Sequence, residues 1–247
     1  FLNGMWISDM PWAASRTFGY PAFISAIYAI SNNAIWLVLA VQTVLNVLMV
    51  PMVYWSSKTL FDSQKSGTVA AALFSLSAIS VAWAARYLFT ETLFTFIFLI
   101  FIMVYLRFWR SESLRWFLLF GLLLGIGTIV RSALQYFLVI PLIIIMLQEL
   151  KVPKKLFLAL GVSFGLLVVL SPFQLLNYNA YGHYSLSTIS GNMLVNQVVT
   201  TKATVDETTR EEALYSLVGE DWDAITNPFE KSDVAKRKSI EWAMSQP

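Results

Sequence analysis

The sequence contains no cysteine and a single histidine, His183, among its 247 residues. Without cysteine the chain forms neither disulfides nor thiolate nucleophiles, and it offers no thiolate ligands for metals. One histidine also excludes the usual multi-histidine metal sites. Charged residues make up only 13% of the chain, where a soluble domain usually carries about 25%. The formal net charge of +2 gives no electrostatic footprint for nucleic acid, so no nucleic-acid partner is expected.

Apolar residues are abundant, at 57% of the sequence, and the mean hydropathy is +0.64. The shortage of charge falls mostly between Ala34 and Pro172, whereas the residues beyond it have the composition of soluble protein. A bilayer core about 30 Å thick needs roughly 20 apolar residues per helix. The pattern therefore predicts an all-α polytopic membrane protein with about six transmembrane helices. We expect these spans at about residues 34–55, 68–85, 88–106, 116–130, 132–147 and 156–172.

The apolar stretch from Trp116 to Leu147 is interrupted by Arg131, near its middle. One helix over the whole stretch would be about 48 Å long, which is too long for a bilayer without a strong tilt. Two helices of about fifteen residues each would be short for a full crossing. The two-helix arrangement places three basic loops on one face, as the positive-inside rule favours, whereas one helix would move the last of them to the other side. We therefore predict a hairpin that turns at Arg131.

The same rule places the three basic loops in the cytoplasm. Residues 1–33 then form an extracytoplasmic loop, in which the stretch from Gly19 to Ile30 is too short to span and is predicted to be a helix in the outer interface. Residues 34–172 form the transmembrane domain. Residues 173–247 form an extracytoplasmic soluble segment that is mostly helical. Both visible termini are therefore expected outside the cytoplasm.

Helix start signals support a helical tail. Thr208 and Thr209 precede Glu211 and Glu212, which is the pattern of an N-terminal cap. The dipeptide Asn227-Pro228 marks the start of another helix, because proline is favoured in the first turn. We see no internal repeat and no low-complexity tract.

Three arginines are predicted on the outer face of the membrane. Two short helices would hold the turn at Arg131 below the surface, beside a water-filled cavity, because non-helical backbone at that depth needs one. The alternative is an arginine that snorkels to the lipid headgroups. A cavity lined by Arg16, Arg86 and Arg131 would suit an anionic lipid phosphate, because the guanidinium group matches a phosphate with a planar fork and keeps its charge.

Two carboxylates and the histidine are further candidates on this face. Glu91 is either a cavity carboxylate or a loop residue paired with Arg86, and ionisable groups at membrane depth tend to be functional. Asp9 is either a catalytic carboxylate or an ordinary turn residue. His183 follows the last predicted span, close to the same face, where it is either part of the site or an exposed loop residue.

Four segments resemble motifs of the GT-C superfamily, polytopic glycosyltransferases that use polyprenyl-phosphate sugars and include the protein mannosyltransferase and aminoarabinose transferase groups. Residues 16–21, Arg-Thr-Phe-Gly-Tyr-Pro, resemble the R-x-P-G-Y-P segment, with Phe18 in place of its first proline. Residues 90–94, Thr-Glu-Thr-Leu-Phe, are similar to T-E-x-L-F at a span entrance. Residues 121–127 and the following Arg131 resemble G-L-L-x-G-x-x with its arginine. Residues 177–194 are similar to the segment that leaves the membrane after the middle spans, although Leu176 replaces an arginine.

The resemblance implies an inverting glycosyltransferase in the plasma (inner) membrane. An outer-facing carboxylate would deprotonate an acceptor hydroxyl or amine, which attacks the anomeric carbon of the sugar as the polyprenyl phosphate leaves. In the family this catalytic aspartate precedes the R-x-P-G-Y-P segment, and Phe1 to Gly4 resemble residues that follow it. We therefore expect an internal fragment, inactive by itself and without the base, which leaves Asp9 and Glu91 as the candidates within the chain.

The resemblance also implies roles for the outer-face residues. Arg16, Arg86, Arg131 and His183 would bind the donor phosphate, and Tyr20 and Glu91 would line the substrate cavity. A divalent metal ion could assist, but no residue is assigned to it. The expected partners are a polyprenyl-phosphate sugar donor, a glycan, lipid or protein acceptor, and membrane lipids.

Two other functions fit the composition. A transporter or flippase for an anionic lipid or solute could use the same arginine-lined cavity. Transporters usually have paired repeats and broken helices near the midplane, whereas here the polar groups gather at one face, which favours an enzyme. A membrane scaffold with a partner-binding tail is the third possibility, and it predicts that the outer arginines can be replaced without effect.

Overall fold

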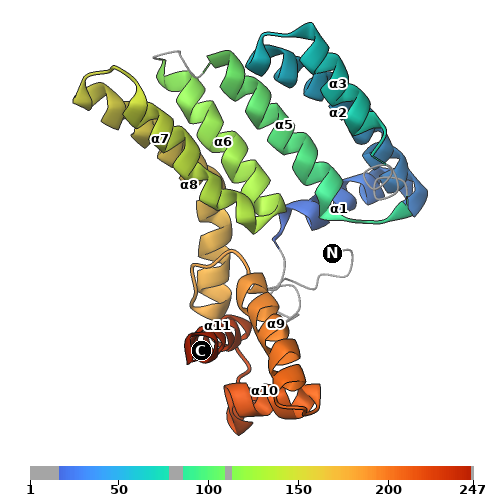
Figure 1. Cartoon of the computed structure of the whole chain (residues 1–247), viewed down its shortest axis with the longest axis vertical. Coiled ribbons are helices and arrows are strands. Elements are labelled where there is room, and N and C mark those ends of the chain that lie inside the picture. The colour runs from blue at the N-terminus through green and yellow to red at the C-terminus, as the bar shows by residue number, and fades with distance from the viewer. Residues whose placement is uncertain (1–16, 78–85, 109–112, 246–247) are drawn as a thin grey trace. The chain divides into compact units, whose positions relative to one another are not determined.

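The computed structural model describes residues 17–77, 86–108 and 113–245. All regular secondary structure in these residues is helical (Figure 1). The described residues form two compact units, one of residues 18–172 and the other mainly of residues 173–245. The helix α8 begins in the first unit and ends in the second. The two units are described separately below.

The first unit is built from apolar helices. Three helices are long and apolar enough to cross a membrane, namely Ile35–Phe61, Thr90–Arg107 and Val152–Tyr181, and two shorter apolar helices accompany them. The described residues thus contain three candidate membrane-spanning helices, and the count of about six spans stays a prediction. The elements are α1 (Gly19–Ser31), α2 (Ile35–Phe61), α3 (Gln64–Ser75), α5 (Thr90–Phe108), α6 (Leu114–Val130), η3 (Ser132–Leu138), α7 (Val139–Leu147) and α8 (Val152–Tyr181).

Several helices differ in extent from the predicted spans. The structure shows α2 ending at Phe61 rather than near residue 55, and α8 running from Val152 to Tyr181 rather than stopping at Pro172. A change to polar composition marks where apolar residues end, but the backbone hydrogen bonds of a helix continue through polar residues. The predicted second span, 68–85, begins within α3, and its residues 78–85 lie outside the described residues.

The amide side chains of α2 face the protein, whereas many of its large apolar side chains face outward. Gln42 is fully buried and Asn46 is nearly so, whereas Val44, Val47 and Leu48 are among the exposed large hydrophobic residues. A soluble protein would place these residues the other way round, because burying an amide has a cost that burying valine or leucine does not. The pattern is that of a helix whose outer surface meets lipid and whose polar groups point into the bundle.

Small residues allow α6 and α8 to approach closely. Gly121 and Gly125 on α6 and Gly161 and Gly165 on α8 are spaced four residues apart, and all four are buried. A Cβ atom at Gly121 would overlap the carbonyl of Val162, and one at Gly165 would overlap the backbone of α6. This is the small-xxx-small packing that brings helices together in membranes, where backbone contact replaces the hydrophobic driving force.

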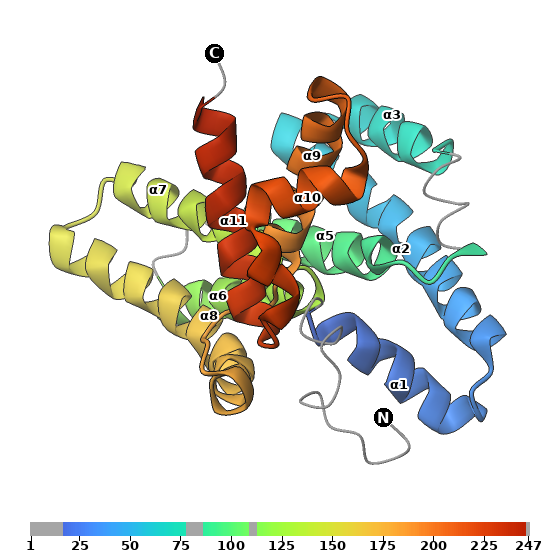
Figure 2. The same ribbon diagram turned by 90° about the horizontal axis from the view of Figure 1, so that it is seen from below.

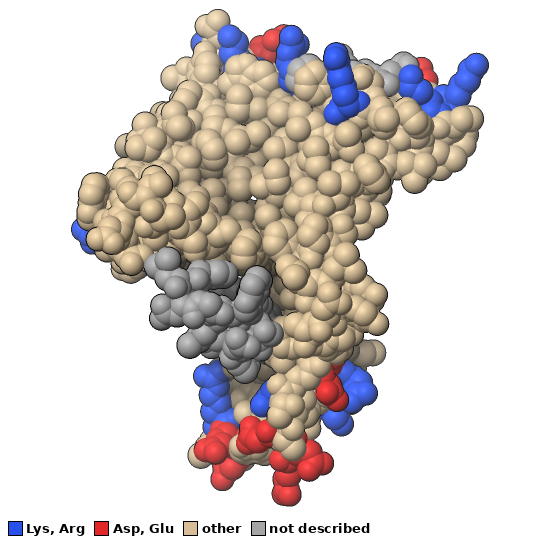
Figure 3. Space-filling model, turned by 180° about the vertical axis from the view of Figure 1, so that it is seen from behind, with Lys and Arg blue, Asp and Glu red and all other residues tan. Residues whose placement is uncertain are grey.

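Most of the basic side chains of this unit gather at one end of its helices (Figure 3). Lys58 and Arg107 lie in the last turns of α2 and α5, and Arg115 lies at the start of α6. At the opposite end lie α1, the first turn of α5 and the last turn of α6 (Figure 1). The ends of the helices therefore form two chemically different faces, one basic and one carrying the residues described next.

The second unit is a small helical assembly of α9 (Ile189–Val205), α10 (Arg210–Val218), η4 (Glu220–Ala224) and α11 (Pro228–Ser245) (Figure 2). Valine side chains of α9 pack against Ala213, Leu217 and Trp222 in its core. The predicted start signals are present. Thr209 and Glu212 form a capping box at α10, with Thr209 Oγ1 accepting from the Glu212 N–H and Glu212 Oε2 accepting from the Thr209 N–H.

Candidate functional site

The chain breaks its helical path at Arg131. The helix α6 ends at Val130, and Arg131 has an extended backbone, with φ −147° and ψ 110°. Its N–H still donates to the carbonyl of Gly127 at 2.8 Å, so the residue closes α6 while its side chain leaves the helix. The sequence predicted a turn at this position, and the helical stretch 114–147 is indeed divided here into α6 and the pair η3–α7.

The side chain of Arg131 forms an ion pair with Glu91. Its Nη1 donates to Glu91 Oε1 at 2.9 Å, and the two side chains are 46% and 35% exposed. The guanidinium group also lies over the ring of Phe94, 5.6 Å from its centroid. One of five N–H donors is used by the ion pair, so the same guanidinium group has the capacity to bind an anion as well. Partial exposure leaves the pair accessible to a ligand.

Glu91 is placed by the first turn of α5. A carboxylate there is stabilised by the positive end of the helix dipole. The hydroxyl of Thr90 donates to Glu91 Oε2 at 3.3 Å, while the other carboxylate oxygen accepts from Arg131. Glu91 thus holds the arginine, and the alternative in which it pairs with Arg86 is not the arrangement that the structure shows.

Tyr20 lies in the first turn of α1, beside the end of α6. A Cβ atom at its neighbour Gly19 would come within 2.6 Å of the carbonyl oxygen of Ile129, so only glycine allows the two backbones this contact. Tyr20 itself is only 6% exposed. Burial raises the pKa of its hydroxyl to about 12, a hydrogen bond with the side chain of Gln42 acts in the opposite direction, and the charge of Glu91 raises the pKa further.

Gln42, on α2, is the last residue of the group that contains Arg131, Glu91 and Tyr20. It is fully buried, and its Nε2 donates to the carbonyl of Phe89 at 3.1 Å. This bond ties α2 to the segment just before Glu91. Gln42 was not among the predicted site residues, although a polar side chain within an apolar span is itself a signal of function.

Three other predicted residues precede Glu91 in the sequence. Arg86 is exposed, a few residues before α5. Asp9 and Arg16 lie outside the described residues, so their predicted roles stay predictions. Among the residues that the structure describes, no cluster of three or more His, Asp or Glu side chains could hold a metal ion.

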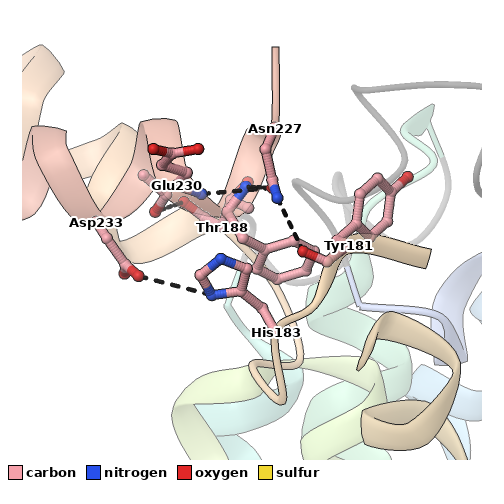
Figure 4. Close-up of polar contacts among 8 residues, drawn as sticks. Tyr181, His183, Thr188, Asn227, Glu230 and Asp233 are labelled. Carbon is pink, nitrogen blue, oxygen red and sulfur yellow. Dashed lines mark hydrogen bonds and ion pairs between the residues drawn. The ribbon is translucent and has the colours of Figure 1, made fainter. Parts of the chain in front are cut away.

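His183 belongs to the second unit and has partners there (Figure 4). Its Nδ1 lies 3.8 Å from Asp233 Oδ2, and its ring stacks on Phe229 with the centroids 5.6 Å apart. The Asn227 side chain donates to the Tyr181 carbonyl at 2.8 Å and accepts from the N–H of Phe229 at 3.0 Å. These contacts join the end of α8 to the start of α11, so in the structure His183 helps to hold the tail helix.

One comparison with known proteins gives a match. A family model described as dolichyl-phosphate-mannose-protein mannosyltransferase matches residues 15–175, which is more than half of the chain. Tyr20, Gln42, Glu91 and Arg131 all lie in the matched part. No curated protein and no solved structure matches the chain.

Proposed function

Because the chain belongs to the dolichyl-phosphate-mannose-protein mannosyltransferase family, and is therefore a membrane glycosyltransferase by family, we propose that it acts on a lipid-linked sugar. In this proposal the donor is a polyprenyl-phosphate sugar, and the sugar passes to a glycan, lipid or protein acceptor on the extracytoplasmic face. The observation that carries the proposal is the ion pair of Arg131 and Glu91, at the end of the helices opposite to the basic loops.

Arg131 is the proposed ligand of the donor phosphate. It is a permanent cation in a membrane protein, partly exposed and fixed in direction by Glu91 and Phe94. As the bond between the anomeric carbon and the phosphate oxygen breaks, negative charge grows on the leaving phosphate. A guanidinium group already held beside that phosphate stabilises this charge without having to reorganise. Arg16, Arg86 and His183 stay predictions as further phosphate ligands.

Glu91 is proposed to position Arg131 rather than to act as the general base. One of its carboxylate oxygens accepts from Arg131 and the other from Thr90, so both are engaged in holding the arginine. A base must instead reach the acceptor hydroxyl or amine within hydrogen-bond distance. The inverting attack on the anomeric carbon therefore requires another carboxylate, for which Asp9 is the candidate in this chain.

The proposed orientation of the helices in the membrane follows from the distribution of Lys and Arg residues. The basic ends of α2, α5, α6 and α8 gather at one end of the first unit (Figure 3), and cytoplasmic loops carry such an excess of Lys and Arg. The Arg131–Glu91 end then faces away from the cytoplasm, as expected for a multi-pass protein of the plasma (inner) membrane with an extracytoplasmic tail.

The test uses the protein in proteoliposomes. We expect transfer from a polyprenyl-phosphate sugar, with inversion at the anomeric carbon observed by NMR of the product. A panel of lipid-linked sugars would identify the sugar. Transfer from a nucleotide sugar and from none of the lipid-linked donors would contradict the proposal, as would a product with retained configuration.

A further inference from the structure

The outward-facing apolar side of α8 continues almost to the end of the helix. Leu160, Phe164 and Leu167 are exposed large hydrophobic residues on this helix, and so are Leu175 and Tyr178. With 3.6 residues per turn, the five positions lie within about 80° of one another around the helix axis. They therefore form one stripe, which begins in the apolar middle of α8 and runs on to Tyr178.

The length of α8 places Tyr178 at the level of a membrane interface. The first turn of the helix carries Lys154 and Lys155, and lysines near the end of a span extend to the lipid headgroups. Tyr178 lies about 36 Å along the axis from Lys154, whereas the hydrocarbon core of a bilayer is about 30 Å thick. When α8 crosses a bilayer from the lysines onward, Tyr178 therefore reaches the headgroups of the opposite leaflet.

A second tyrosine is folded back onto the first. The chain turns after α8 at Gly182, whose φ of +74° lies in the left-handed region that favours glycine. The ring of Tyr184 stacks on that of Tyr178, with the centroids 4.4 Å apart and the rings 11° from parallel. The side chain of Asn177 donates to the Ser185 carbonyl at 2.7 Å and holds the same loop. The tyrosines are nevertheless 45% and 57% exposed.

A pair of exposed tyrosines has the chemistry of a membrane interface. The rings are apolar and gain from leaving water, while the hydroxyl groups need hydrogen-bond partners. The headgroup region supplies both, because acyl chains lie on one side of it and water, phosphate and ester groups on the other. Tyrosine is enriched at membrane interfaces for this reason.

We propose that Tyr178 and Tyr184 form an interfacial anchor, which lies among the lipid headgroups at the end of α8. The partner of this surface is the bilayer, because Tyr178 continues the stripe that faces lipid in the middle of the helix. The Asn227 side chain donates to the Tyr181 carbonyl, so the anchor also holds the start of α11 near the headgroups. The inference goes beyond the proposed function, since it holds whichever reaction the protein catalyses.

The depth of the anchor is measured with a fluorophore attached to Ser185→Cys, in the protein reconstituted into phosphatidylcholine vesicles. The chain has no other cysteine. Ser185 is exposed and adjacent to Tyr184, so the label reports on the pair while both tyrosines are kept. One set of vesicles carries a nitroxide on the lipid headgroup and the other carries it at the end of the acyl chain. The headgroup nitroxide should quench about twofold more or better, because the two nitroxides differ in depth by about half of a core 30 Å thick.

Leu167→Cys, labelled in the same way, is the matched control. Leu167 lies on the same stripe of α8 and is also about half exposed, but it is only about 20 Å along the axis from Lys154. Its label should therefore be near the middle of the bilayer. There the nitroxide at the chain end should be the stronger quencher, which is the reverse of the order expected at position 185.

Replacement of the tyrosines tests whether they hold the loop at this depth. In the Ser185→Cys protein, Tyr178→Ser together with Tyr184→Ser removes both rings and should reduce quenching by the headgroup nitroxide. Tyr178→Trp should keep that quenching, because tryptophan favours the same region. Tyr136→Ser, which removes an exposed tyrosine of η3, should have no effect at position 185.

Three results would overturn the anchor. If neither nitroxide quenches the label at position 185, the pair faces water, as a surface for a glycan would. If the chain-end nitroxide is the stronger quencher there, the pair lies in the hydrocarbon core. If the double serine variant is quenched as strongly as its parent, the tyrosines do not hold the loop. Since no sugar or donor lipid is present in these vesicles, each of these results leaves the proposed function standing.

Discussion

Nη1 of Arg131 lies 2.9 Å from Oε1 of Glu91, although the two residues are 40 positions apart in the chain. The pair joins the break after α6 to the first turn of α5. The pair also meets two opposing requirements. An arginine that binds a phosphate must be free to move toward its substrate, and yet its side chain must be held in a productive direction. A carboxylate partner meets both, since it fixes the guanidinium group without using all of its donors.

Glu91→Gln tests this positioning role. The amide keeps the size of the side chain and one acceptor but loses the charge that holds Arg131. We expect kcat to fall about tenfold or more, because small misplacements of a group at a reacting centre have large effects on rate. Transfer is measured with saturating donor. Thr90→Ala, which removes the weaker contact to the same carboxylate, should have a smaller effect. Equal rates for Glu91→Gln and the unmodified protein would show that Arg131 needs no partner.

Gly121→Ala tests the close approach of α6 and α8. The added methyl group would overlap the Val162 carbonyl, so the helices must move apart, and overpacking of this kind usually destabilises by about 1–3 kcal/mol. The change should appear as a lower thermal midpoint in detergent. Ile126→Ala on the same helix is the control, because Ile126 is 40% exposed and should have a much smaller effect. A normal midpoint for Gly121→Ala would show that the two helices are not in backbone contact.

Thr209→Ala tests the capping box of α10. Thr209 Oγ1 accepts from the Glu212 N–H at 3.2 Å, and loss of such a cap destabilises a helix start by about 1 kcal/mol. Hydrogen exchange of the α10 amides in the whole protein should become faster, while α11 stays protected. Thr208→Ala, one residue before the cap, is the control. Unchanged exchange in α10 would contradict the cap.

The same cap predicts a pH dependence. The N–H and hydroxyl of Thr209 lower the pKa of Glu212 from its ordinary value. A carboxyl group whose pKa is lower in the folded state stabilises that state above its unfolded pKa, and this contribution is lost as the pH falls through the folded value. Exchange of the α10 amides, corrected for the intrinsic rate, should therefore increase on acidification below the ordinary glutamate range. Glu212→Gln should remove that dependence, and a dependence that survives in this variant would contradict the assignment.

The orientation can be tested directly because the chain has no cysteine. Lys65→Cys lies in the first turn of α3, on the side that we place in the cytoplasm, and Lys236→Cys lies on α11 in the tail. Both positions are exposed. In intact cells a membrane-impermeant maleimide should label the variant at 236 and spare the one at 65. The opposite labelling would invert the proposed topology.

Much of the fold could be predicted because its signals are local. The stretch from Gly19 to Ile30 corresponds to α1, which ends one residue later. The pair Thr209 and Glu212 marks the start of α10, and Asn227 marks that of α11. A single arginine within a long apolar stretch marks the break after α6. In each case the deciding interaction lies within a few residues of the signal.

The internal contacts of the site could not be predicted in the same way. Gln42 and Asn46 indicate the buried face of α2, because polar side chains in a span face the protein, but the sequence does not show which distant group they contact. The position of Gln42 therefore became clear only from its bond to Phe89. The choice between Arg86 and Arg131 as the partner of Glu91 likewise depends on helix packing, which brings distant residues together.

The most direct test of the account is the affinity of the complete protein for polyprenyl phosphate, measured for the unmodified form, Arg131→Ala and Arg115→Ala. Arg115 is an exposed arginine at the basic end of α6, so its variant controls for the loss of one positive charge. If Arg131 binds the phosphate, Arg131→Ala should weaken binding at least tenfold, in line with the loss of a charge-assisted contact worth about 1.5–3 kcal/mol, while Arg115→Ala should bind normally. Equal affinity of all three proteins would contradict the central claim that Arg131 holds the donor phosphate.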